Sequence, residues 1–160
     1  MIANDAITDL DAHALSQAIH ARTLSCFEVM QAYLQRIHRL NPIYNAIVNI
    51  APDDVLLAQA HACDAELAAG HSRGWMHGMP QAIKDLAETK GLRTTMGSPL
   101  FRDYVPAKSH PLVERIERKG GIVVAKSNTP EFGAGGSTFN EVFGRTRNPW
   151  NTALTCGGST

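Results

Sequence analysis

The sequence predicts an α/β fold in which helices come first and then alternate with short strands. Three helical patterns and one short strand fill residues 1–70, and two further strand patterns follow, one on either side of a further helix. A helix–strand–helix–strand order of this kind is typical of α/β domains. Hydrophobic residues make up 44% of the 160 residues, which is enough for a buried core and excludes a disordered chain.

Capping signals mark the first two helices. Asp11 can cap a helix over residues 12–21, with Leu15 and Ile19 on one face. Ser25 and Glu28 have the capping-box spacing ahead of a second helix. An apolar stripe at spacings of three and four runs through this second helix to Leu40, so we expect it to end before Asn41-Pro42.

The rest of the first 70 residues predicts a strand and a third helix. Residues 46–50 (Ala-Ile-Val-Asn-Ile) are mostly apolar and rich in β-branched side chains, which favours the strand. Pro52 opens the helix, two aspartates occupy its first turn, and Gly70 follows its end. We therefore interpret residues 1–70 as an N-terminal helical region and residues 71–160 as the start of an α/β core.

The second region predicts two strands and one clear helix. A strand over residues 81–84 follows Pro80, and a buried strand of a largely parallel sheet is expected over residues 121–125. Between them, a helix over residues 112–119 would be capped by Ser109 and closed by Gly120. Thr129-Pro130-Glu131 has the pattern of another helix start.

Charge and cysteine content narrow the classes of function. Lys+Arg and Asp+Glu are both 15, so no net charge attracts nucleic acid or an anionic membrane, and we expect neither as a partner. No apolar run approaches the roughly 20 residues of a membrane span, and the N-terminus lacks a signal-peptide pattern. Three widely spaced cysteines argue against a disulfide framework. We expect a cytoplasmic protein.

Lys84 is the first candidate for chemistry. It ends an apolar strand, and Asp85 follows it directly. A neutral lysine held at such a position can act as a general base. The local pattern also fits an exposed lysine at a strand end that pairs with a carboxylate.

Two glycine-rich segments are the other candidates. Gly157 and Gly158 precede Ser159, and glycines permit backbone angles and close approaches that other residues do not. Residues 133–138, which begin at Gly133, have a similar composition. Either segment could face a substrate or form an ordinary surface turn.

No metal or cofactor site is expected. The seven histidines show no ligand spacing, and the cysteines form no CxxC pair. No Gly-Lys-Ser/Thr follows residues 133–138, so they are not a phosphate-binding P-loop.

Several segments in order resemble the amidase signature family. These are residues 78–85 (Gly-Met-Pro-Gln-Ala-Ile-Lys-Asp), 91–98 (Gly-Leu-Arg-Thr-Thr-Met-Gly-Ser), 126–132 (Lys-Ser-Asn-Thr-Pro-Glu-Phe), 143–150 (Phe-Gly-Arg-Thr-Arg-Asn-Pro-Trp) and 157–159 (Gly-Gly-Ser). The resemblance covers most of the chain. It implies a layered α/β/α domain with a mixed sheet and N-terminal helices, of which residues 1–160 are the N-terminal part.

The resemblance also implies a function. Family members hydrolyse carboxylic amides through a Ser–cis-Ser–Lys triad. Lys84 matches the family's lysine, and Ser159 matches its cis-serine. Gly133 falls on the loop that in relatives faces the substrate through its backbone. A small-molecule amide is then the expected partner, and the mechanism uses no cofactor.

Three positions depart from the family pattern, and one catalytic member is missing. Thr160 stands where a second serine is usual, Gln81 where an apolar residue is frequent, and Cys156 where proline is frequent. The resemblance places the nucleophilic serine beyond residue 160. We therefore expect no amide hydrolysis from the 160 residues alone, which would hold only the lysine and the cis-serine.

Two alternatives stay open. One is the amidase-like subunit of a tRNA-dependent amidotransferase, although that subunit typically has aspartate where this chain has Pro130. The other is a catalytically inactive amidase fragment.

Overall fold

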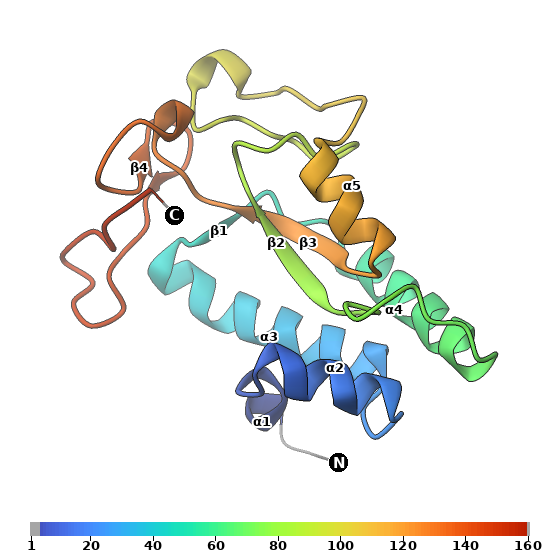
Figure 1. Ribbon diagram of the computed structural model, residues 1–160. Coiled ribbons are helices and arrows are strands. Elements are labelled where there is room, and N and C mark those ends of the chain that lie inside the picture. Colours follow the sequence, from blue (N-terminus) through green and yellow to red (C-terminus); the bar gives the residue numbers. More distant parts are fainter. Residues whose placement is uncertain (1–3, 160) are drawn as a thin grey trace. The chain divides into compact units, whose positions relative to one another are not determined.

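The computed structural model describes residues 4–159, which form helices and short strands (Figure 1). The elements in chain order are α1 (Asn4–Thr8), α2 (Ala12–His20), α3 (Cys26–Tyr44), β1 (Ile47–Val48), α4 (Asp53–Ala68), β2 (Pro80–Lys84), the 3₁₀ turn η1 (Pro99–Phe101), α5 (Pro111–Arg118), β3 (Ile122–Ser127), the 3₁₀ turn η2 (Glu131–Gly133), β4 (Phe139–Asn140) and β5 (Gly144–Arg145). This mixture confirms the predicted α/β class. Thr160 lies outside the described residues.

Two compact units make up the chain, and each is built from three segments. The first unit comprises Met1–His38, Ala51–Gln81 and Arg115–Val124, and the second comprises Arg39–Ile50, Ala82–Glu114 and Ala125–Thr160. The predicted boundary after residue 70 stays a prediction. No helix among residues 4–159 is both long and apolar enough to cross a membrane.

The interiors of the two units differ in polarity. The first unit buries a large apolar set, contributed mostly by α2, α3 and α4 and including Ile19, Met30 and Leu56. The buried polar and charged side chains of the described residues all lie in the second unit, with the single exception of His77. Buried polar groups are costly unless they are hydrogen-bonded. The second unit is therefore where we expect side chains that serve binding or catalysis in addition to packing.

The capping signals predicted for α2 and α3 are confirmed. The Asp11 side chain accepts a hydrogen bond from the Ala14 N–H at 2.8 Å, and Leu15 and Ile19 of α2 are buried. Ser25 and Glu28 bond reciprocally, because the Glu28 N–H donates to Ser25 Oγ at 3.0 Å and the Ser25 N–H donates to Glu28 Oε2 at 2.9 Å. Each bond satisfies a donor that the first helical turn leaves without a partner.

The predicted end of α3 is wrong, since the helix continues through Pro42 to Tyr44. Proline has no N–H to donate and disfavours helix at the preceding residue, which was the basis of the prediction. The Asn41 side chain compensates for this in the last turn. Its Oδ1 accepts from the N–H groups of Ala46 and Ile47, at 3.0 and 2.8 Å, and its Nδ2 donates to the Ile47 carbonyl at 2.7 Å.

Two further helix predictions needed correction. Ser109 does not cap α5; its Oγ accepts from the Lys90 N–H, while the His110 ring accepts from the Leu112 N–H at 3.2 Å. The segment after Pro130 forms only η2, because Phe132 adopts a positive φ of 50° and its N–H donates to the Met96 carbonyl at 2.8 Å. A bond to a distant segment thus replaces the second helical turn.

The main sheet is mixed and has the strand order β1-β3-β2. Strand β1 pairs antiparallel with β3, so that Ile47 lies opposite Ser127. Strands β2 and β3 run in the same direction, since the Ile122 N–H donates to the Met79 carbonyl near their starts and the Asp85 N–H donates to the Ser127 carbonyl near their ends. Lys84 is the last residue of β2 and therefore lies at the carboxyl end of this parallel pair.

Gly120 is expected to tolerate alanine poorly, and Gly70 provides a matched control. Both have positive φ, 95° and 81°, yet a Cβ at Gly120 would lie 2.6 Å from the Cα of His77, whereas one at Gly70 meets nothing within 4 Å. We expect Gly70→Ala to lower the free energy of unfolding by about 1 kcal/mol. Gly120→Ala should cost a further 1–3 kcal/mol or so because backbone must move. Urea unfolding measures both, and equal losses would contradict the close approach.

Candidate active site

The structure brings Lys84 and Ser159 together. Lys84 Nζ lies 2.8 Å from Ser159 Oγ and donates a hydrogen bond to it, although the two residues are 75 positions apart. Both side chains belong to the second unit, and both residues are partly buried. The peptide bond between Gly158 and Ser159 is cis, as the resemblance implied. The two residues that the sequence singled out therefore form one pair.

Backbone contacts with a neighbouring segment hold Ser159 in place. The Thr138 N–H donates to the Gly157 carbonyl at 3.0 Å, and the Cys156 N–H donates to the Thr146 carbonyl at 3.1 Å. A Cβ at Gly158 would lie 3.0 Å from the backbone of Ser137, so a larger residue would push the two segments apart. Glycine at position 158 permits this close approach.

Gly133 lies in η2, next to the turn that follows Lys84. Its φ is 75°, and its N–H donates to the Pro130 carbonyl at 2.8 Å. A Cβ at this position would lie 2.8 Å from Leu86 Cδ1. Gly133 thus lies against a side chain only two residues beyond Lys84, and its own N–H already has a partner in Pro130, the residue before η2.

Sequence reasoning missed a buried polar cluster beside this pair. Lys126 and Asp85 both have an exposed fraction of 0%. Lys126 Nζ donates to the Ala87 carbonyl and, at 2.9 Å, to Thr89 Oγ1. The Asp85 carboxylate accepts from the N–H and, at 2.5 Å, from the hydroxyl of Thr95. The only available signal was a lysine that ends the apolar run of β3, which also fits an exposed strand end.

Burial changes the proton affinity of both charged groups. It lowers the pKa of Lys126 to about 8, and the charge of Asp85 counteracts part of this. Burial also raises the pKa of the Asp85 carboxyl, while the hydrogen bonds from Thr95 and the charge of Lys126 oppose that rise. Each group therefore depends on the other for its charged form.

The ammonium of Lys126 is expected to titrate near pH 8 in the folded protein, against about 10.4 for an exposed lysine. NMR of ¹³Cε-labelled lysine, with the signal assigned by its loss in Lys126→Met, measures this directly. A Lys126 midpoint at the exposed-lysine value would contradict the burial seen in the structure.

The same titration has a consequence for stability. The unfolded chain keeps the proton up to about pH 10.4, while the folded protein releases it from about pH 8. The unfolded state therefore binds more protons between these values, and Lys126 makes the free energy of unfolding rise with pH in that window. Measuring the pH dependence of the free energy of unfolding in the parent and in Lys126→Met isolates this effect. The buried thiols of Cys26 and Cys63, whose pKa values burial raises, contribute equally to both proteins and therefore cancel in the comparison.

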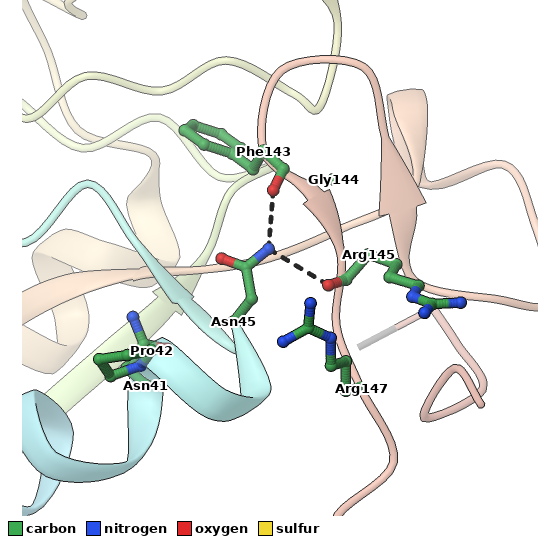
Figure 2. A pocket seen from close by; sticks show the side chains of 7 residues that line it. All are labelled: Asn41, Pro42, Asn45, Phe143, Gly144, Arg145 and Arg147. Atoms are coloured by element: carbon green, nitrogen blue, oxygen red, sulfur yellow. Dashed lines mark hydrogen bonds between the residues drawn. The ribbon is translucent and has the colours of Figure 1, made fainter. Parts of the chain in front are cut away.

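A pocket of about 410 Å³ lies elsewhere in the second unit, between the end of α3 and the hairpin of β4 and β5 (Figure 2). Figure 2 shows Asn45 joining these segments, because its Nδ2 donates to the carbonyls of Phe143, at 2.7 Å, and Arg145, at 3.2 Å. Neither Lys84 nor Ser159 lines this pocket. Among residues 4–159, no three His, Cys, Asp or Glu side chains gather as metal ligands would.

Comparison with known proteins identifies the family. The family model described as Amidase matches residues 28–160. A glutamyl-tRNA(Gln) amidotransferase subunit of Dehalococcoides mccartyi is 38% identical over 156 residues, which are 96% of this chain and 32% of that protein. Indoleacetamide hydrolase of Bradyrhizobium diazoefficiens is 38% identical over 142 residues, which are 89% of this chain and 27% of that protein.

Solved structures agree with the sequence matches. A fatty acid amide hydrolase superimposes with a TM-score of 0.92 at 28% identity, over 99% of this chain and 28% of that one. The native peptide amidase of Stenotrophomonas maltophilia gives a TM-score of 0.86 at 31% identity, over 94% of this chain and 32% of that one. The chain thus spans about a third of the length of the relatives it matches. With the family model matching most of its residues, the chain belongs to the amidase signature family.

Proposed function

We propose that this chain is part of an amidase that hydrolyses carboxylic amides, with Lys84 as the general base and Ser159 as the proton relay. The observation that carries the proposal is the 2.8 Å contact between Lys84 Nζ and Ser159 Oγ. A lysine and a serine hydroxyl at this distance can pass a proton between them without further movement.

The chemistry follows from the pair. Neutral Lys84 takes the proton of the Ser159 hydroxyl, and Ser159 takes a proton from a nucleophilic serine, which the proposal requires from outside these 160 residues. That serine attacks the amide carbonyl, and the proton returns through the relay to the leaving amine as the acyl-enzyme forms. Water then attacks the acyl-enzyme with the same pair as base, which releases the carboxylic acid and restores the serine.

The names of the relatives support two substrate classes. Indoleacetamide hydrolase is named for a small amide, and peptide amidase is named for the amides of peptides. Several relatives at 36–42% identity are instead glutamyl-tRNA(Gln) amidotransferase subunits, which favours amide transfer to a charged tRNA as the second candidate. Pro130, where such a subunit typically has aspartate, supports the small-amide substrate.

A parallel assay separates these candidates. The purified protein that carries these residues is given aliphatic, aromatic and amino-acid amides, and released ammonia or amine is measured. Amide transfer to glutamyl-tRNA(Gln) is measured in the same preparation. We expect hydrolysis of at least one small amide without tRNA. Transfer to the tRNA with no hydrolysis of any free amide would favour the amidotransferase, and neither reaction would favour the inactive fragment.

A further inference from the structure

Asp85 and Lys126 are fully buried, carry opposite charges and have no part in the proton relay. Burying two charged groups disfavours folding unless their hydrogen bonds are well satisfied. We propose that Asp85 and Lys126 are positioning residues that fix the turn after β2, and through it hold both Lys84 and the loop of Gly133. This inference rests on the proposed function of Lys84.

Lys126 closes the turn directly behind Lys84. Its Nζ donates to the Ala87 carbonyl, and the Ala87 N–H donates to the Lys84 carbonyl at 3.0 Å. A second bond from Nζ, 2.9 Å long, reaches Thr89 Oγ1. Lys126 therefore holds both ends of the short segment 87–89. The first residue of that segment, Ala87, is hydrogen-bonded to the backbone of Lys84.

Asp85 anchors the same turn from the other side. Its N–H donates to the Ser127 carbonyl at 2.9 Å, which continues the pairing of β2 with β3. Its carboxylate accepts two hydrogen bonds from Thr95, one from the N–H at 3.1 Å and one from the hydroxyl at 2.5 Å. Asp85, the residue directly after Lys84, thus connects the end of β2 to the segment that begins at Thr95.

The Thr95 segment in turn holds the loop that carries Gly133. The Met96 carbonyl accepts from the Phe132 N–H at 2.8 Å, and Ser98 Oγ donates to Glu131 Oε1 at 2.7 Å. Leu86, between Asp85 and Ala87, is the side chain against which Gly133 packs. The cluster therefore links the base and the glycine loop through an unbroken set of contacts within the second unit.

Polar partners explain why apolar residues would not serve here. The Ala87 carbonyl and the Thr95 N–H point to buried side chains of opposite charge, and an apolar pair would leave them without these partners. No buried side-chain nitrogen or oxygen among the described residues lacks a hydrogen bond, so each buried polar side-chain atom of the cluster has at least one partner. A buried network whose members all have partners favours one local geometry.

The test uses Lys126→Met in the protein that carries this chain, assayed on an amide that the parent hydrolyses. We expect kcat to fall by about 10- to 100-fold, with KM changed far less, since misplacing a catalytic group by about 1 Å costs rates of this size. Lys108→Met, at an exposed lysine, should leave kcat unchanged. Val113→Ala, which opens a cavity at a fully buried apolar residue, controls for lost stability and should also leave kcat unchanged.

The double variant Lys84→Ala/Lys126→Met separates positioning from general structural damage. If Lys126 acts through Lys84, adding Lys126→Met to Lys84→Ala should lower the residual rate no further. If the rate losses of Lys84→Ala and Lys126→Met multiply in the double variant, this inference is wrong, while the proposed function stands. The same holds if kcat of Lys126→Met lies within about twofold of the parent. Normal turnover of Lys84→Ala would overturn the proposed function and this inference with it.

Thr95→Val keeps the test informative if Lys126→Met does not fold. It removes the hydroxyl, which donates to Asp85 and accepts from the Gly97 N–H at 3.1 Å, and keeps the side-chain volume. We expect the same selective fall in kcat, smaller in size and absent from the Lys84→Ala background. An unchanged kcat in a folded Thr95→Val protein would overturn the role of Asp85.

Discussion

Lys84→Ala is expected to lower kcat for amide hydrolysis by about 10²- to 10⁴-fold in the protein that carries this chain, with the fold intact. A positioned general base contributes rate factors of this size, and alanine leaves nothing to accept the proton of Ser159. Lys84 contacts Ser159 Oγ at 2.8 Å, and it is the only described side chain for which a hydrogen bond to that oxygen is seen. Steady-state kinetics measures the loss, and circular dichroism checks the fold.

Lys108→Ala is the matched control for this substitution. Lys108 is exposed and lies in the same compact unit as Lys84, so Lys108→Ala removes the same side-chain atoms without touching the pair. We expect its kcat to equal that of the parent. Near-normal turnover of Lys84→Ala would remove Lys84 from the role of base.

The starts of α2 and α3 were predictable because the capping signal and its effect lie within one turn. Asp11 caps α2, and Ser25 with Glu28 caps α3, because each bond joins residues three positions apart. Prediction failed where a distant or unusual partner decided the outcome. The Asn41 side chain stabilises the end of α3 beyond Pro42, and the Met96 carbonyl takes the N–H that a helix after Pro130 would have used. Single-sequence patterns do not contain such partners.

The site was predictable only in part, for the same reason. Local sequence left Lys84 and Ser159 as either ordinary surface residues or catalytic ones, and only the ordered motifs of a family paired them across 75 positions. Lys126 was invisible to both approaches as a buried group. Its partners, Ala87 and Thr89, lie 39 and 37 positions away, so nothing near Lys126 in the sequence reveals that it is enclosed.

Ser159→Ala is expected to reduce kcat by about 10²- to 10⁴-fold while raising KM much less. The Ser159 hydroxyl lies 2.8 Å from Lys84 Nζ and would move a proton only as the amide bond breaks, so its loss should weaken binding of the transition state selectively. Ser72→Ala, at an exposed serine of the first unit, is the control and should change neither constant. A rise in KM at constant kcat would instead make Ser159 a substrate-binding residue.

The double variant Lys84→Ala/Ser159→Ala tests whether Lys84 and Ser159 act together in one proton relay. Residues that pass a single proton along a relay lose their function together, so the losses from Lys84→Ala and Ser159→Ala should not multiply. We expect the double variant to be about as slow as the slower single variant, because removing either side chain already breaks the contact between Lys84 Nζ and Ser159 Oγ on which the proposed relay depends. A double variant slower by the product of both factors would show that the two side chains assist the reaction independently, despite their contact.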